Sequence, residues 1–140
     1  MQKQRAAVSW QATLRVFEAS HLHTAISKEL GMQPTRQHHK GDPLSERFPF
    51  IKDGVFTKDA WLLISPVPED RLLDEHLAWH AKLLRQHMIF MKRLRSEGVT
   101  IDISCTCKLR DGTTQFAISS EQIDIFSHIG IQLTYLVIRS

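Results

Sequence analysis

The sequence contains no asparagine and only two cysteines, and these absences exclude several kinds of site. Without asparagine there is no acceptor for N-linked glycosylation. Cys105 and Cys107 are separated by one residue, a spacing at which a disulfide between them would be badly strained. Two reduced thiols in a chain without an export signal predict a cytoplasmic protein.

Long apolar segments are missing as well. The longest uninterrupted apolar run covers residues 60–64, which is too short to cross a bilayer. The charged residues near Met1 are not followed by the apolar stretch of a signal peptide, so we expect no membrane association. The net charge of +3 falls short of the dense basic patch of a dedicated nucleic-acid binder, so nucleic acid is not the expected partner.

Signatures of catalysis are also lacking. No Ser-His-Asp arrangement, no paired-carboxylate pattern and no nucleotide fingerprint stands out in the chain, so we lean against an enzyme and expect no cofactor. The length of 140 residues suits one ordinary domain. We expect a short tail at residues 1–8 and a single domain at 9–140.

What is present is a regular succession of predicted elements. Strand-like alternation marks residues 9–18 and 100–108, and residues 61–65 are predicted as a short buried strand. Asp111-Gly112 predicts a hairpin turn into a strand at 114–118. Short helices are predicted before Gly31 and, after a capping box at Ser119, before Gly130. The last strand, 131–138, is apolar on both faces and should lie inside the sheet. These elements predict an α+β fold, a mixed and mainly antiparallel sheet with one long and two short helices packed on it.

The long helix is expected at residues 72–97. At about 100° per residue, His76, His80 and His87 fall within roughly 40° of one another on its apolar stripe. A straight helix of this length extends about 40 Å, about the diameter of a compact domain of this size. Either the helix kinks, or one end projects and packs on a second copy, which would make the protein a homodimer.

The histidines of this stripe have two interpretations. His76 and His80 at i and i+4 could bind zinc from one helical face, but Leu77 stands where a metalloprotease helix needs its general base. No third ligand is evident, so we assign no metal and keep His76, His80 and His87 only as the residues a metal site would use. The more frequent arrangement is buried imidazoles that hydrogen-bond to backbone or sheet groups.

Two further segments are candidates for a ligand or partner surface. Residues 36–40 are short, polar and basic, which suits either a solvated edge strand or a surface for an anion or partner. The irregular segment 43–60 concentrates aromatic side chains, which either line a pocket mouth or pack the loop onto the sheet. Cys105 and Cys107 share a face with apolar neighbours and are expected in the core. The candidate surface comprises Arg36, His38, His39, Lys40, Phe48, Phe50, Phe56 and Trp61.

The order and spacing of certain residues resemble the bacterial family called domain of unknown function 4279. The resemblance runs from about Trp10 to Val137 and rests on Thr13-Leu14-Arg15-Val16, Ile26, Leu30-Gly31, Pro34-Thr35, Lys40-Gly41, Trp61, Ser65, Glu75-His76-Leu77, Trp79, Phe116, Ile118-Ser119 and Gly130. It implies a compact α+β domain without an established activity and supplies no site residues. Members commonly carry an aliphatic residue at the place of His80, which disfavours a metal site shared by the family.

Three functions follow as expectations. The first is a small cytoplasmic, non-catalytic protein-binding module, of which a toxin-neutralising immunity protein is one kind, with another protein as its partner. The alternative is a metal- or small-ligand-dependent enzyme or sensor that uses the His76/His80/His87 face. The second alternative is a weak nucleic-acid binder, which would show steep salt dependence.

Overall fold

The computed structural model describes residues 8–139. Most of the predicted tail therefore lies outside the described residues, and Val8 already begins the first strand. The strands are β1 (Val8–Phe17), β2 (Arg36–His38), β3 (Ala60–Ile64), β4 (Thr100–Leu109) and β5 (Gln132–Arg139). The helices are α1 (His23–Leu30), α2 (Leu73–Arg85), α3 (Met88–Ser96) and α4 (Ser120–Ile129), with 3-10 turns η1 (Ser20–Leu22) and η2 (Leu44–Glu46).

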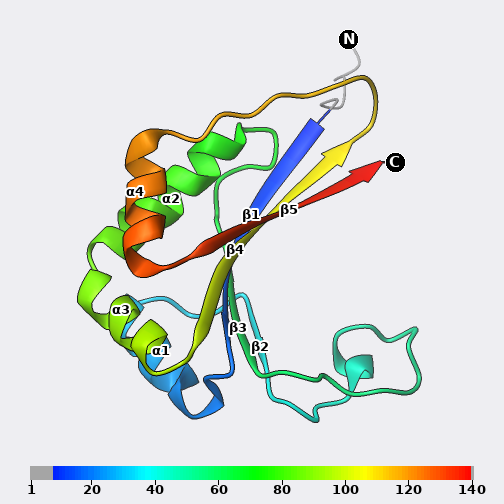
Figure 1. Ribbon diagram of the computed structural model, residues 1–140. Coiled ribbons are helices and arrows are strands. Elements are labelled where there is room, and N and C mark those ends of the chain that lie inside the picture. The colour runs from blue at the N-terminus through cyan, green and yellow to red at the C-terminus, as the bar shows by residue number, and fades with distance from the viewer. Residues whose placement is uncertain (1–7, 140) are drawn as a thin grey trace.

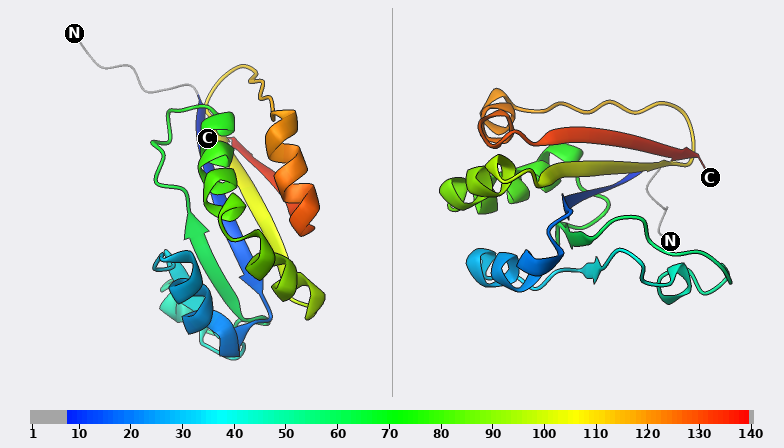
Figure 2. Two further views of the ribbon diagram at one scale, coloured as in Figure 1. Left: turned by 90° about the vertical axis from the view of Figure 1, so that its left-hand side faces the viewer. Right: turned by 60° about the horizontal axis from the view of Figure 1, so that its bottom comes forward.

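The strands form one sheet in the order β2-β3-β1-β4-β5. All neighbouring pairs are antiparallel except β4 and β5, which are parallel. The four α-helices lie on the same side of the sheet, to its left in Figure 1. The left view of Figure 2 shows α2 running roughly along the direction of the strands. The predicted α+β class, with a mixed and mainly antiparallel sheet, is confirmed.

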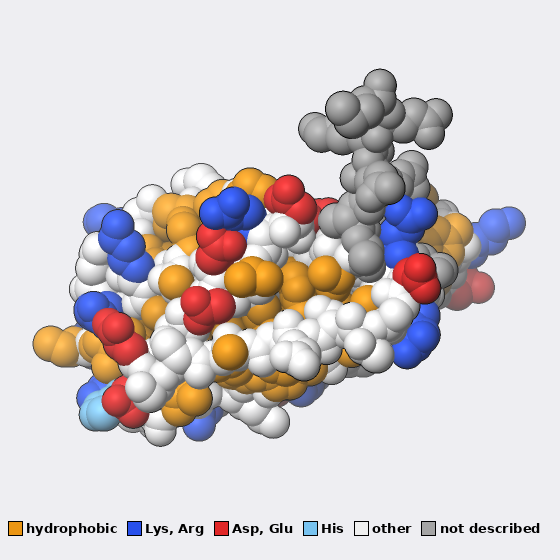
Figure 3. Space-filling view, turned by 90° about the horizontal axis from the view of Figure 1, so that it is seen from above, with side chains coloured by type: hydrophobic (Ala, Val, Ile, Leu, Met, Phe, Trp, Pro, Cys, Tyr) orange, Lys and Arg blue, Asp and Glu red, His pale blue; other side chains and the backbone are white. Residues whose placement is uncertain are grey.

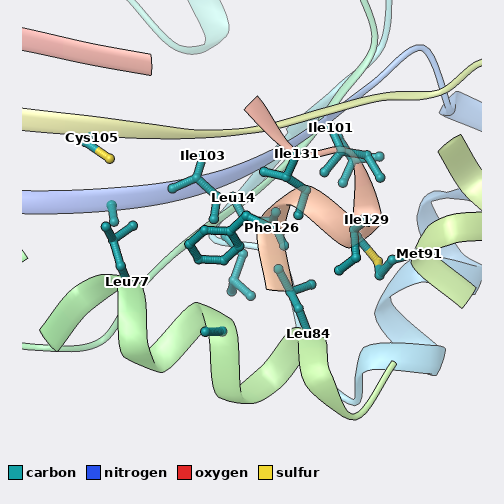
Figure 4. Close-up of a cluster of buried hydrophobic side chains, with 14 of the residues drawn as sticks. Leu14, Leu77, Leu84, Met91, Ile101, Ile103, Cys105, Phe126, Ile129 and Ile131 are labelled. Carbon is teal, nitrogen blue, oxygen red and sulfur yellow. The ribbon is translucent and has the colours of Figure 1, made fainter. Parts of the chain in front are cut away.

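The core lies between this helical layer and one face of the sheet. Alternate residues of β1, including Leu14 and Val16, are fully buried because the pleat directs them toward the helices. Leu77 and Leu84 of α2 reach the same layer, and Figure 4 shows them directed toward the sheet near Phe126 of α4. The opposite face of the sheet, which we call the open face, carries no α-helix of the described chain.

The predicted long helix is present but divided. α2 ends at Arg85, the chain turns through Gln86 and His87, and α3 begins at Met88. The turn lets Met91 and Leu94 of α3 bury their side chains in the core, at 0% and 2% exposure. A straight rod would have carried this last part away from the sheet. The prediction of a single long helix is therefore wrong in this detail, and the kink is the alternative that the structure adopts.

Two predictions near the C-terminus are also wrong. Residues 114–118 form no strand, because β5 pairs with β4 from Asp102 to Leu109 and leaves that edge no room for another partner. Phe116 instead places its ring against Tyr135, with centroids 5.2 Å apart. β5 is the edge strand of the sheet rather than an inner one. Its apolar character therefore reflects something other than burial within this chain.

Candidate binding cleft and the buried histidines

A cleft of about 600 Å³ opens between the edge of the sheet and the loop that follows β2. We call it the aromatic–basic cleft, and its lining is Arg36, Gln37, His38, Glu46, Arg47, Phe48, Phe56 and Leu62. One wall comes from β2 and β3, which pair with Arg36 opposite Leu62. The other wall comes from residues 39–59, which we call the 39–59 lobe and which stands out at the lower right of Figure 1.

The 39–59 lobe is held by its own backbone hydrogen bonds. The amide of Gly41 donates to the carbonyl of Phe56 at 2.9 Å, and the amide of Phe56 donates to the carbonyl of Asp42 at 2.9 Å. A further bridge joins Pro43 to Val55. These bonds make the segment a loose hairpin rather than an extended loop.

The two phenylalanine rings of the cleft each contact a nitrogen-bearing side chain. The ring of His38 stacks on that of Phe56 with centroids 3.7 Å apart, and the Arg47 guanidinium lies 4.8 Å above the centre of the Phe48 ring. Burial lowers the pKa of His38 below its ordinary value, which favours a neutral ring. The positive charge of the cleft therefore comes from its arginines, Arg36 and Arg47, against the single carboxylate of Glu46.

Four of the eight residues predicted for a partner surface line this cleft, namely Arg36, His38, Phe48 and Phe56. The structure folds the aromatic segment back so that it lines the same cleft as the basic segment that precedes it in the sequence. The other lining residues, Gln37, Glu46, Arg47 and Leu62, were not predicted individually, although all but Leu62 lie within the two predicted segments. Arg47 stands directly before an aromatic residue in an otherwise irregular segment, and that pairing could have indicated it.

The other four predicted residues lie elsewhere. His39 stacks on His23, and the amide of Lys40 donates to an Asp59 carboxylate oxygen at 2.6 Å. Phe50 is 81% exposed and its ring lies 6.1 Å from that of Phe48. Trp61 is fully buried, so its place in a contact surface is corrected. Its indole N–H donates to Ser27 Oγ at 2.9 Å, which fixes α1 to the sheet.

The histidine stripe of α2 is buried against the sheet. His76 and His80 are both fully buried, and Nδ1 of His76 lies 2.6 Å from the hydroxyl of Ser65. Nε2 of His80 lies 2.8 Å from the carbonyl oxygen of Ala12, so this nitrogen carries the proton and donates. Dehydration of the ring lowers the pKa of His80 to about 4. The expectation of buried imidazoles bound to backbone and sheet groups is confirmed for these two residues.

His87 is not part of this buried pair. It lies at the turn between α2 and α3, where its Nδ1 is 3.6 Å from a carboxylate oxygen of Glu29. Within residues 8–139, no group of three or more His, Cys, Asp or Glu side chains is arranged to hold a metal ion. The three histidines of the predicted stripe therefore do not converge on one point.

Two further features of the sheet are the cysteines of β4 and an ion pair between β1 and β4. Cys105 and Cys107 are buried in β4 as predicted, and burial raises the pKa of the Cys105 thiol to about 12. On the open face, Arg15 donates to both carboxylate oxygens of Asp102, at 2.7 and 2.5 Å. This bidentate ion pair connects β1 to β4. The hydroxyl oxygen of Thr134 on β5 lies 3.4 Å from Nη2 of Arg15 and 3.4 Å from Oδ2 of Asp102.

A second depression of about 500 Å³ lies where α2 begins, and its lining is Leu72, Leu73, Asp74, Gln115, Phe116, Ala117, Ile118 and Ser119. Figure 3 shows hydrophobic side chains along a hollow on that side of the molecule. Its polar side chains are Asp74, Gln115 and Ser119, with no cation among them, so it offers fewer charged groups than the aromatic–basic cleft. Among the helices of the described chain, none combines the length and the apolar character that a transmembrane segment requires.

Comparison with known proteins gives one family and no annotated relative. No curated protein and no solved structure matches the chain. The profile of the family described as domain of unknown function (DUF4279) matches residues 8–137, which is nearly the whole chain. The resemblance noted in the sequence is thereby confirmed, and the chain belongs to this family.

Proposed function

We propose that this protein is a non-catalytic protein-binding module whose contact surface is the aromatic–basic cleft. The partner we infer is a protein segment that carries a carboxylate next to an apolar side chain. The observation that supports this most directly is the pairing of two arginines with two phenylalanine rings in a single cleft of about 600 Å³.

The arginines define the charge of the partner. Arg36 and Arg47 are both exposed, and each guanidinium can donate two parallel hydrogen bonds to a carboxylate. Neither arginine forms an ion pair with a carboxylate of the described chain. An acidic side chain of a partner would therefore meet donors that are free to reorient toward it.

The rings define the apolar part of the partner. Phe48 and Phe56 are each half-buried, so they are held by the lobe yet keep a face toward the cleft. Burying apolar surface on such rings is a common source of binding energy at protein interfaces. Leu62 of β3 extends the apolar floor, and the neutral His38 ring adds surface without adding charge.

A peptide selection tests this proposal. Random peptides displayed on phage are selected against the wild-type protein, and the enriched peptides are synthesised and titrated by calorimetry. We expect the enriched sequences to combine Asp or Glu with a large apolar residue. The double variant R36Q/R47Q should weaken their binding about 10- to 100-fold, because it removes charge-assisted hydrogen bonds worth about 1.5–3 kcal/mol.

Phe48→Ala should also weaken binding, because it removes a ring of the cleft, and the matched control is Ile89→Ala. Ile89 is 78% exposed on α3 and does not line the cleft, so its loss should leave the affinity unchanged. The proposal fails if no peptide is enriched. It also fails if the enriched peptides bind R36Q/R47Q as well as they bind the wild-type protein.

A further inference from the structure

β5 presents an unpaired strand edge that lacks the usual protection. It extends over eight residues, pairs on one side with β4, and ends the sheet on its other side. In Figure 1 the strand lies in front of β1 and β4, and no other part of the described chain passes in front of it. Its outer amides and carbonyls are therefore available to another strand.

The opposite edge of the sheet shows what protection looks like. β2 has only three residues, carries Arg36, and is flanked by the 39–59 lobe. Natural proteins guard sheet edges with short strands, charges, prolines or bulges. Between Leu133 and Ile138, β5 has no charged residue and no proline, and its register with β4 is unbroken.

The side chains of β5 are apolar and exposed on both faces. The exposed fractions are 46% for Tyr135, 54% for Leu136, 59% for Val137 and 40% for Ile138. A soluble protein rarely leaves four consecutive large apolar residues open to water unless something covers them. On the helical side, Phe116 is stacked on Tyr135 and is itself 48% exposed, so the apolar surface continues beyond the strand.

We propose that the β5 edge binds the β5 edge of a second copy of this chain, antiparallel, so that two sheets join into one sheet of ten strands. A two-fold axis perpendicular to the sheet keeps opposing residues on the same face, and it therefore has to pass midway between one residue and the copy of that residue in the other strand. Centred on Leu136, such an axis pairs Tyr135 with Val137 and Thr134 with Ile138.

This register explains why a second copy fits the edge. Every opposing pair from Thr134 to Ile138 is uncharged, so the strand meets its own copy without like-charge repulsion. Stable dimers bury about 800 Å² on each partner, more than the backbone edge of one strand supplies. The exposed rings of Phe116 and Tyr135 supply further apolar area next to that edge.

The assembly would also position the aromatic–basic clefts. Each cleft lies at the β2 edge, which is the far end of each five-stranded sheet. The perpendicular two-fold axis leaves both clefts on the same side of the joined sheet, roughly 40 Å apart at about 4.8 Å per strand.

Sedimentation equilibrium across a series of protein concentrations tests the dimer. We expect a mass that rises toward twice 16.1 kDa for the wild-type protein. Leu136→Lys should raise the dissociation constant at least about 100-fold, because it sets two like charges opposite each other at the axis. Ile89→Lys introduces the same charge on the exposed surface of α3 and should dimerise like the wild-type protein.

A mixing experiment identifies the two-fold pairing itself. Leu136→Lys and Leu136→Glu should each be monomeric alone and should form a dimer when mixed, because opposite charges then meet across the axis. Hydrogen exchange on the wild-type protein needs no variant, and the β5 amides should become more protected as the protein concentration rises. The proposal is overturned if the wild-type protein stays monomeric, if Leu136→Lys still dimerises, or if β5 exchange is independent of concentration.

Discussion

Acidification should destabilise this protein through the histidine that α2 buries against the sheet. The pKa of His80 falls from an ordinary 6.5 to about 4 in the folded chain, because the ring is fully buried and loses its water. Its Nδ1 has no hydrogen-bond partner among the described residues, so a proton placed there would be stabilised by none of them. The folded state therefore resists protonation that the unfolded chain accepts.

The sign and size of this pH effect follow from the linkage between protonation and folding. The folded pKa is lower than the unfolded one, so the stabilisation is complete above about pH 6.5 and is lost as the pH falls toward 4. Each unit of pKa difference between the two states is worth about 1.4 kcal/mol, which gives a total loss of about 3 kcal/mol. About 2 kcal/mol of this should disappear between pH 7 and pH 4.5. The pKa values of His76 and His23 are also lowered by burial, so both residues act in the same direction.

Urea denaturation at a series of pH values, followed by tryptophan fluorescence, measures this effect. His80→Gln keeps an amide that can donate to the Ala12 carbonyl but cannot titrate, so its unfolding free energy should fall about 2 kcal/mol less over that range. His21→Gln is the matched control, because His21 is exposed and its replacement leaves the buried ring in place. Parallel pH profiles for the wild-type protein and His80→Gln would refute the reasoning.

Two further perturbations test the sheet and its connections. Arg15→Met should lower the unfolding free energy by about 2 kcal/mol in urea titrations, because it leaves the Asp102 carboxylate, which is 7% exposed, without its cation. Adding Asp102→Asn to that variant should recover part of the loss, and a further loss of equal size would contradict it. Gly130→Ala should cost about 1–2 kcal/mol, because φ is +86° and the new Cβ would lie 3.1 Å from Arg95 Nε. Gly98→Ala has a similar φ of +88° but no atom within 4 Å, so in thermal unfolding it should be the milder of the two.

The parts of the fold that could be predicted from sequence are those whose signals are local. Alternation in β1 and β4 and the glycines that end α1 and α4 lie within a few residues of what they determine. The turn at Gln86 and His87 contains no proline or glycine, so the local sequence does not predict it. It arises because α3 gains buried contacts by bending back to the sheet, and that gain depends on residues far away in the chain. The same holds for residues 114–118, whose strand-like pattern lost its partner to β5.

In the candidate site, too, local sequence predicts the individual segments but not how they are brought together. The sequence singled out the basic segment and the aromatic segment separately, but only the pairing of β2 with β3 places Arg36 opposite Leu62 and beside the lobe. Trp61 looked like part of that surface because it follows the aromatic segment directly. Its position in β3, opposite Val16, directs it into the core instead. Sequence proximity was a poor guide here because the chain crosses from loop to strand within two residues.

The apolar run of β5 shows how one pattern supports two different structures. A strand that is apolar on both faces is typical of an inner strand covered on both sides. Here the strand lies at the sheet edge, and its four consecutive apolar residues stay 40–59% exposed. The pattern also suits a strand that has a neighbour on each side within the sheet, and in the proposed dimer β5 of the second copy is that second neighbour. An inner position of β5 would then be a property of the dimer, which explains why the single chain does not provide it.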